Sequence, residues 1–184
     1  MARLPPADST NAETAEVYAE IKATRGFVSN ALKSLGHAPG GLKHFARVGE
    51  YVKYKTDLPE RLRELAILTA TRPIPYAWSH HGPLAEQAGI ARSAIDEIGL
   101  GKVPAALTSE EQAIVRFVME LGDLKVSDAT MAAMKSRFSP RQIVDIAMSA
   151  TYYGALGRMV VALGVDLEDA DALRTERDWQ KGRT

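Results

Sequence analysis

The pattern of apolar and polar positions along the chain predicts helices and no strands. Apolar residues recur at intervals of three and four through most of the 184 residues, as on one face of a helix. No segment alternates with a period of two, and no Asn-Gly or Asp-Gly hairpin turn occurs. Because helix start and stop signals separate the periodic segments, the sequence predicts an all-α fold.

The capping signals give the expected helix boundaries. A first helix should begin near Asn11, with Thr10 or Asn11 as its cap, and end at the breaker Gly26. A short helix follows and is expected to close over residues 37–41. Further helices are expected over residues 42–54, 59–71, 75–89, 93–98, 108–122, 126–138 and 139–164. The charged end after them is expected to be frayed or to pack against a neighbouring subunit.

The length of the chain suits one domain with a sizeable core. We expect that single domain to span residues 1–184. Its expected parts are N-terminal helices over about 10–56, a central motif region over about 58–99, a second helical half over about 108–168 and a charged C-terminal tail.

The charge balance and the lack of cysteine narrow the possible functions. Lys plus Arg and Asp plus Glu each total 23, and no basic block suggests nucleic acid or an anionic membrane as partner. The stretch MARLPPADST lacks the apolar core of a signal peptide, and no apolar run reaches the length of a membrane span. A soluble cytoplasmic protein is therefore expected. Disulfide, thiolate and cysteine-metal chemistry are excluded because the chain has no cysteine.

Glu64 is the first candidate for chemistry. Ile67 and Leu68 lie three and four positions on and share its side of the helix, so its carboxylate points toward apolar surroundings. A carboxylate there needs a partner, because burying an unpaired charge is costly and shifts its pKa upward. The pattern leaves open a catalytic carboxylate or a structural ion pair with an arginine.

The stretch PYAWSHHGPLA supplies the second candidate. His81 falls on the apolar stripe of its helix together with Trp78, whereas His80 points with Tyr76, nearer the polar side. A histidine on an apolar face can be a satisfied core residue or a catalyst. Pro83 cannot donate a helical hydrogen bond, which predicts a bend that either makes room for a ligand or has no function.

Metal and nucleotide chemistry find little support in the sequence. Adjacent histidines point about 100 degrees apart on a helix, so His80 and His81 cannot both bind one ion there without distortion. Glu64 with one histidine leaves too few ligands for zinc or iron. The chain has no G-x-S-x-G elbow, phosphate loop or dinucleotide fingerprint. We therefore expect neither a metal nor another cofactor.

Three polar residues interrupt the apolar surface of the last long helix. Tyr152 and Tyr153 are expected to send their hydroxyls to a pocket edge or to a backbone carbonyl. Arg158 is expected either to pair with Glu64 or to bind a substrate carboxylate.

The string LPERLRELAILTATRPIPYAWSHHGPLAEQAGI resembles the core of the carboxymuconolactone decarboxylase family. The same superfamily contains the alkylhydroperoxidase D (AhpD) proteins. The similarity extends from about residue 12 to residue 168. It implies an all-helical fold with the site between helices, commonly at a subunit interface, in a dimer, trimer or hexamer.

The resemblance also separates this chain from the peroxidase branch, whose helix carries C-x-x-C-x-x-x-H. With the family histidine placed on His81, Ile74 and Ala77 stand where the cysteines would be. In cysteine-free relatives the place often reads Y-E-W-x-x-H. Tyr76 and Trp78 match that pattern, but Ala77 replaces the acid.

The resemblance implies a cofactor-independent lyase of the decarboxylase type, of the kind used in aromatic compound catabolism, acting on a small carboxylated or lactone-type substrate. His81 would be the acid/base, and Glu64 would orient it. The other candidates for substrate binding are Tyr76, Trp78, His80, Tyr152 and Arg158. The alternative is a non-catalytic ligand-binding or assembly protein on the same fold, which the replacement at Ala77 favours. Peroxide reduction is disfavoured because the cysteines are missing.

Overall fold

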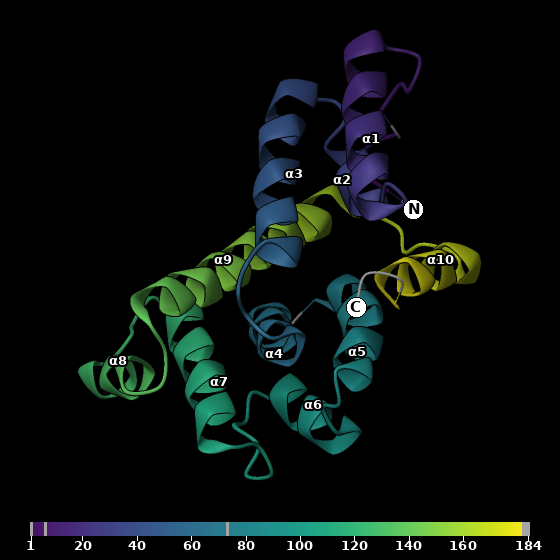
Figure 1. Ribbon diagram of the computed structural model, residues 1–184. Helices are drawn as coiled ribbons and strands as arrows, with labels where there is room; N and C mark the ends of the chain where they lie inside the picture. The colour runs from purple at the N-terminus through teal and green to yellow at the C-terminus, as the bar shows by residue number, and fades with distance from the viewer. Residues whose placement is uncertain (1, 6, 73, 182–184) are drawn as a thin grey trace. The chain divides into compact units, whose positions relative to one another are not determined.

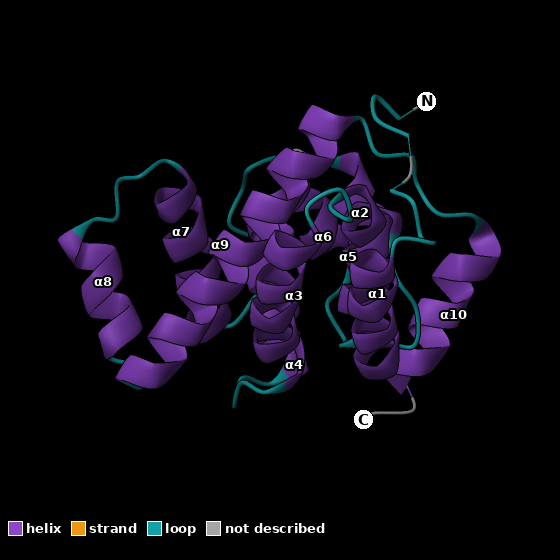
Figure 2. Ribbon diagram, turned by 90° about the horizontal axis from the view of Figure 1, so that it is seen from above, coloured by secondary structure: helices purple, strands orange, loops and turns teal. Residues whose placement is uncertain are grey.

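The computed structural model describes residues 2–5, 7–72 and 74–181. Pro73, expected to help end a helix, and the last three residues of the tail lie outside the described residues. Within the described ranges all regular structure is helical, and Figure 2 shows only helices and loops. The prediction of an all-α fold is confirmed.

The helices follow one another in the order labelled in Figure 1. Their bounds are α1 (Ala12–Arg25), α2 (Asn30–Ser34), α3 (Pro39–Tyr54), α4 (Glu60–Thr71), α5 (Pro75–Gln87), α6 (Arg92–Gly99), α7 (Ser109–Gly122), α8 (Asp128–Lys135), α9 (Pro140–Leu163) and α10 (Ala170–Lys181).

Several helix ends form as the capping signals predict. The side chain of Asn11 accepts a hydrogen bond from the backbone N–H of Thr14, and Gly26 ends α1 in the left-handed conformation. Thr108 and Glu111 form a reciprocal capping box at the start of α7. These helix boundaries can be predicted from the sequence because each depends on side chains a few residues apart.

Two segments differ from the sequence-based expectation. The break expected over residues 37–41 ends earlier, because α3 begins at Pro39, a residue whose fixed φ suits the first helical turn. The charged C-terminal segment is not frayed over Ala170–Lys181 but forms α10. Asp169 accepts a hydrogen bond from the N–H of Ala172 at its start. The ring of Trp179 lies against Gly26, where a Cβ atom would come within 2.6 Å of it.

The described chain forms two compact units, one of Met1–Tyr51 with Arg158–Thr184 and the other of Val52–Gly157. The first unit has its own small apolar core, formed by Val17, Ile21, Leu32, Leu42 and Ala46. Its two chain segments are joined by backbone and side-chain hydrogen bonds, including that of the Glu168 carboxylate, which accepts from the N–H of Asn30 at 2.6 Å. The single-domain organisation stays a prediction.

The second unit is built around α4, which packs against α5, α6 and α7 (Figure 1). Four successive side chains of α4, from Leu65 to Leu68, have no exposed surface. Leu65, Ala66 and Leu68 lie in a core that also includes residues of α6, α7 and the first half of α9. The expectation that the helix around Glu64 is buried on most sides is confirmed, so its polar groups must find partners inside the protein.

Among the described helices, α9 alone is long and apolar enough to cross a membrane by length and composition. The core helix of a soluble protein passes the same test, and Ile146 and Ala150 of α9 do lie in the hydrophobic core. The helix is thus consistent with a soluble protein, and the cytoplasmic location stays a prediction.

Leu124, just after α7, provides a test of the backbone. It has a φ of 56° and is 91% exposed, so it adopts a left-handed conformation without packing to compensate. Leu124→Asn should raise the free energy of unfolding by about 0.5–1 kcal/mol, because asparagine tolerates this conformation better. Urea denaturation measures the change. Leu100→Asn, at an exposed leucine with a φ of −82°, is the matched control and should change stability little. Equal effects of the two substitutions would contradict the explanation.

Candidate active site

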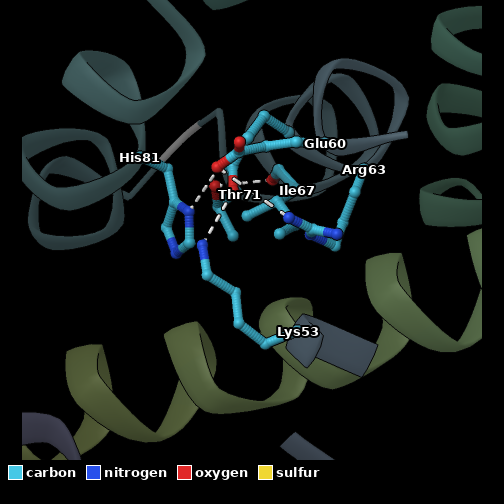
Figure 3. A network of polar contacts seen from close by, with 7 residues as sticks. Lys53, Glu60, Arg63, Ile67, Thr71 and His81 are labelled. Atoms are coloured by element: carbon cyan, nitrogen blue, oxygen red, sulfur yellow. Dashed lines mark hydrogen bonds and ion pairs between the residues drawn. The ribbon is translucent and has the colours of Figure 1, made fainter. Parts of the chain in front are cut away.

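A buried carboxylate joins side chains from three helices of the second unit. Glu64 of α4 has no exposed surface, and its Oε1 lies 2.8 Å from the Nζ of Lys53 of α3. Its Oε2 lies 2.8 Å from the Nδ1 of His81 of α5. Lys53 is 3% exposed and His81 is 6% exposed. Figure 3 draws the contacts of Lys53 and His81 as dashed lines.

The local sequence explains why this carboxylate is available to both partners. The other polar side chains buried on α4 bond to their own helix: Thr69 donates to the carbonyl of Leu65 at 2.7 Å and Thr71 to that of Ile67 at 2.8 Å. These hydroxyls are thus satisfied without Glu64. Its carboxylate accepts from groups on neighbouring helices instead.

Opposing effects set the charge of the ion pair. Burial alone would raise the pKa of Glu64, but the positive charge of Lys53, followed by His81, holds that pKa well below its usual range. Burial is the largest single effect on Lys53 and acts to lower its pKa, but the charge of Glu64, the nearby Tyr153 and the hydrogen bond to Glu64 together raise that pKa. Both groups are therefore ionised near neutral pH.

The ionised carboxylate fixes the orientation of the histidine. Carboxylate oxygens only accept hydrogen bonds, so the Nδ1 of His81 is the donor to Glu64. In the neutral ring, Nδ1 then carries the hydrogen and Nε2 has the lone pair. A histidine held in this way can take up a proton at Nε2 and return it.

Tyrosines of α9 pack beside the histidine. The ring of Tyr153 meets that of His81 edge to face, with centroids 4.7 Å apart. Tyr152 packs in the same manner against Tyr153, at 5.1 Å. Of the two tyrosines singled out in the sequence, Tyr153 thus contacts the histidine ring, and Tyr152 supports Tyr153.

The second histidine lies deeper than its position on the helix predicts. His80 is only 7% exposed, and its ring packs against that of Tyr76 with centroids 4.9 Å apart. The expectation that His80 is near the polar side of the helix is wrong. The buried face of α5 is broad enough to include both adjacent histidines, so the direction of one side chain does not determine its exposure.

Trp78 is half-buried at the edge of the hydrophobic core. It packs against the core cluster and against Gly99 of α6, where a Cβ atom would come within 2.9 Å of the indole ring. Its buried Nε1 has no hydrogen-bond partner within the described part of the chain. Its expected role as a pocket wall stays a prediction.

The cation that pairs with Glu64 is a lysine and not an arginine. Lys53 was not among the candidates from the sequence, although a signal was present: it lies four residues after Gly49 and seven after Ala46, on the buried stripe of α3. Arg158, proposed as the partner, is exposed and belongs to the other unit. The expected pairing of Arg158 with Glu64 is therefore wrong, because Lys53 and His81 engage the two carboxylate oxygens.

Comparison with known proteins identifies the fold that carries this site. No family model matches the sequence, and no curated protein matches it. A solved structure from Ralstonia eutropha JMP134, described as an alkylhydroperoxidase AhpD core and an uncharacterized peroxidase-related protein, superposes with a TM-score of 0.72. It is 19% identical, over 91% of this chain and 93% of its own. The chain has the AhpD-like helical fold.

Two further solved structures share the AhpD-like fold. An uncharacterized peroxidase-related protein from Silicibacter sp. TM1040 has a TM-score of 0.76 and 19% identity, over 92% of this chain and 93% of its own. A variant of the debrominase Bmp8 in complex with 2,3,4-tribromopyrrole has a TM-score of 0.73 and 15% identity, over 99% of this chain and 97% of its own. Identities this low show the fold alone, so the decarboxylase branch stays a prediction.

Within the AhpD-like fold, the two expected cysteine positions hold small or branched apolar side chains. Ile74 precedes the first turn of α5 and Ala77 lies within it, and both are buried. The described residues also contain no group of three or more His, Asp or Glu side chains placed to hold a metal ion. The polar chemistry described around His81 is therefore that of Glu64 and Lys53.

The lowered pKa of Glu64 predicts how stability depends on pH. A carboxyl group whose pKa falls on folding stabilises the protein above its unfolded value, and this contribution is lost as the pH falls through the folded value. Glu64→Gln should cost on the order of 3–5 kcal/mol near pH 7, because it leaves Lys53 buried without its counter-charge. The difference in the free energy of unfolding between this variant and the wild type should decrease as the pH falls below about 4.5.

Urea denaturation at a series of pH values measures this difference. Glu110→Gln, at an exposed residue of α7, is the matched control and should leave stability almost unchanged. A loss in Glu64→Gln that stays constant down to about pH 3 would contradict an ionised Glu64 in the folded protein.

Proposed function

We propose that this protein is a cofactor-independent enzyme that transfers protons on a small carboxylated or lactone-type substrate, in the manner of a decarboxylase. The observation that carries the proposal is the buried hydrogen bond of 2.8 Å between Glu64 Oε2 and His81 Nδ1. It fixes the imidazole in one tautomer and one orientation, as a general acid/base requires.

The chemistry follows from the tautomer. When a carboxylate leaves as carbon dioxide, the electron pair of the broken C–C bond stays on the substrate, delocalised toward the lactone carbonyl. A protonated Nε2 of His81 gives its proton to that carbon and becomes neutral, and water restores the proton. The reverse of the protonation step is removal of a C–H proton by the neutral ring. Glu64 keeps Nδ1 as the donor throughout.

Arg63 supports a carboxylated substrate. Its side chain is 11% exposed, and its Nη2 lies 3.9 Å from Glu60 Oε1, beyond hydrogen-bond distance. Its Nε is buried with no hydrogen-bond partner in the described residues. The charge of Arg63 is close enough to act on Lys53, and Figure 3 draws both residues in one network of polar contacts with His81. A substrate carboxylate would satisfy this guanidinium.

Gly82 supports a small substrate. It is buried next to His81 in α5, yet a Cβ atom built on it would meet no heavy atom within 4 Å. A side chain at this position would therefore have space, next in sequence to His81. The expectation that Pro83 makes room for a ligand stays a prediction.

A second function, ligand binding without turnover, has one observation in its favour. Ala77 is buried and apolar where the resembling cysteine-free sequences carry an acid. If that acid is needed for turnover, the same space would bind a small ligand and release it unchanged.

Deuterium exchange tests proton transfer with a panel of simple compounds and does not require the natural substrate. We expect the protein to exchange the C–H proton next to the carbonyl of small lactones that carry a carboxylate, in D2O, as followed by proton NMR. His81→Gln should slow this exchange by about 100-fold or more, the usual contribution of an acid/base residue. Arg63→Met should weaken the preference for a free carboxylate over its methyl ester.

His44→Gln is the matched control, because His44 is exposed on α3 and outside the site. It should exchange as fast as the wild type. Ligand binding without exchange would support the second function, whereas exchange that persists in His81→Gln would contradict the role of His81.

We also propose that the chain forms a homo-oligomer, a dimer, trimer or hexamer, through α9. Val144 and Met148 lie one turn apart on this helix and are 55% and 36% exposed. A chain with no net charge does not repel its own copies. A second copy of the chain is therefore the occupant that this apolar surface suits.

Light scattering during size-exclusion chromatography measures the mass. Met148→Glu should lower the wild-type mass toward that of a monomer, because a charge would be buried in the contact. Leu100→Glu introduces the same charge at an exposed leucine elsewhere and should not change the mass. A monomeric wild type, or an unchanged mass in Met148→Glu, would contradict this contact.

A further inference from the structure

We propose that Lys53 is a positioning residue that cancels the charge of Glu64 and thereby keeps His81 as the neutral, Nδ1-protonated base in the resting protein. The importance of Lys53 for catalysis rests on the proposed function, but its effect on the charge state of His81 does not. The proposal is based on the geometry of three buried side chains that two contacts of 2.8 Å join.

Counting charges in this buried cluster shows why the lysine matters. With Lys53 positive, Glu64 negative and His81 neutral, the net charge is zero. Protonation of His81 as well would leave one uncompensated positive charge in the interior, which burial disfavours. A neutral Lys53 with an ionised Glu64 and a protonated His81 would also have a net charge of zero. The ammonium holds its proton more tightly by about four pH units, so the proton stays on Lys53.

Other titratable and charged groups lie near the cluster, and Tyr153 and Arg63 both act on the pKa of Lys53. On α4, Arg63 contributes a positive charge and Glu60 a negative one, and their side chains lie 3.9 Å apart. On α9, Tyr153 faces the histidine ring. On α5, His80 packs against Tyr76. Arg63 acts on Lys53 through its charge, but Lys53 is the cation that lies 2.8 Å from the Glu64 carboxylate.

Removing the lysine charge should therefore change the histidine. In Lys53→Met, His81 is the partner left to place a positive charge next to the Glu64 carboxylate. The cluster then has zero net charge when Glu64 is ionised and His81 is an imidazolium. The ring is then held in its protonated form and can no longer act as a base. In the wild type, an anionic substrate brings a negative charge to the neutral cluster, which draws a proton onto His81 only when substrate is bound.

Long-range proton–nitrogen NMR of 15N-labelled protein distinguishes the neutral tautomers from the imidazolium. The chain has four histidines. The His81 signals are those that persist when His37, His44 and His80 are replaced one at a time by glutamine. At about pH 7 we expect the neutral Nδ1–H form in the wild type and the imidazolium in Lys53→Met. The titration midpoint should rise by at least about one pH unit, a tenfold change in proton affinity.

Further variants separate charge from folding. Lys53→Arg keeps the charge and should leave His81 neutral. The double variant Lys53→Met with Glu64→Gln removes both charges and should also return His81 to the neutral form, even if the single variant is unstable. Lys43→Met removes a lysine that pairs with Glu16 and Glu20 in the other unit, and it should leave the His81 signals unchanged.

Two results would overturn the inference. One is an imidazolium, or an Nε2–H tautomer, at His81 in the wild type at about pH 7. The other is a folded Lys53→Met whose His81 titration midpoint equals that of the wild type, or a double variant in which His81 is an imidazolium at about pH 7. A neutral, lysine-dependent His81 without C–H exchange would instead refute only the proposed function. Exchange that needs His81 but is indifferent to Lys53 would refute only this inference.

Discussion

A carboxylate with no exposed surface governs the organisation of this protein around α4. An isolated carboxylate cannot stay ionised in such a place, so the fold must bring a cation and a hydrogen-bond donor to it. Lys53 and His81 meet that requirement from two different helices, each at 2.8 Å. The polar contacts of Glu64 therefore tie α4 to α5 and to the C-terminal end of α3.

The local features of this site could be read from the sequence, because they depend on residues a few positions apart. The spacing of Ile67 and Leu68 shows that Glu64 is directed inward, and the stripe through Trp78 shows the same for His81. The caps at Asn11 and Thr108 follow from side chains within one turn. None of these predictions depends on how the helices pack against one another.

The partners across helices could not be read in the same way. Lys53 precedes Glu64 by 11 residues, and a loop separates their helices, so no periodicity links the two. An arginine was the expected counter-ion, although a compact ammonium reaches a fully buried oxygen as well. His80 was misplaced for a related reason: a helical wheel gives the direction of a side chain but not what covers it.

The pairing of Lys53 with Glu64 also limits which substitutions this protein can accept during evolution. A single replacement of either residue leaves the other as a lone charge in the interior, whereas replacing both with apolar or neutral groups of similar size removes the conflict. The two positions are therefore expected to vary together among descendants of this chain. In an alignment of its relatives, they would form a correlated pair linking α3 to α4.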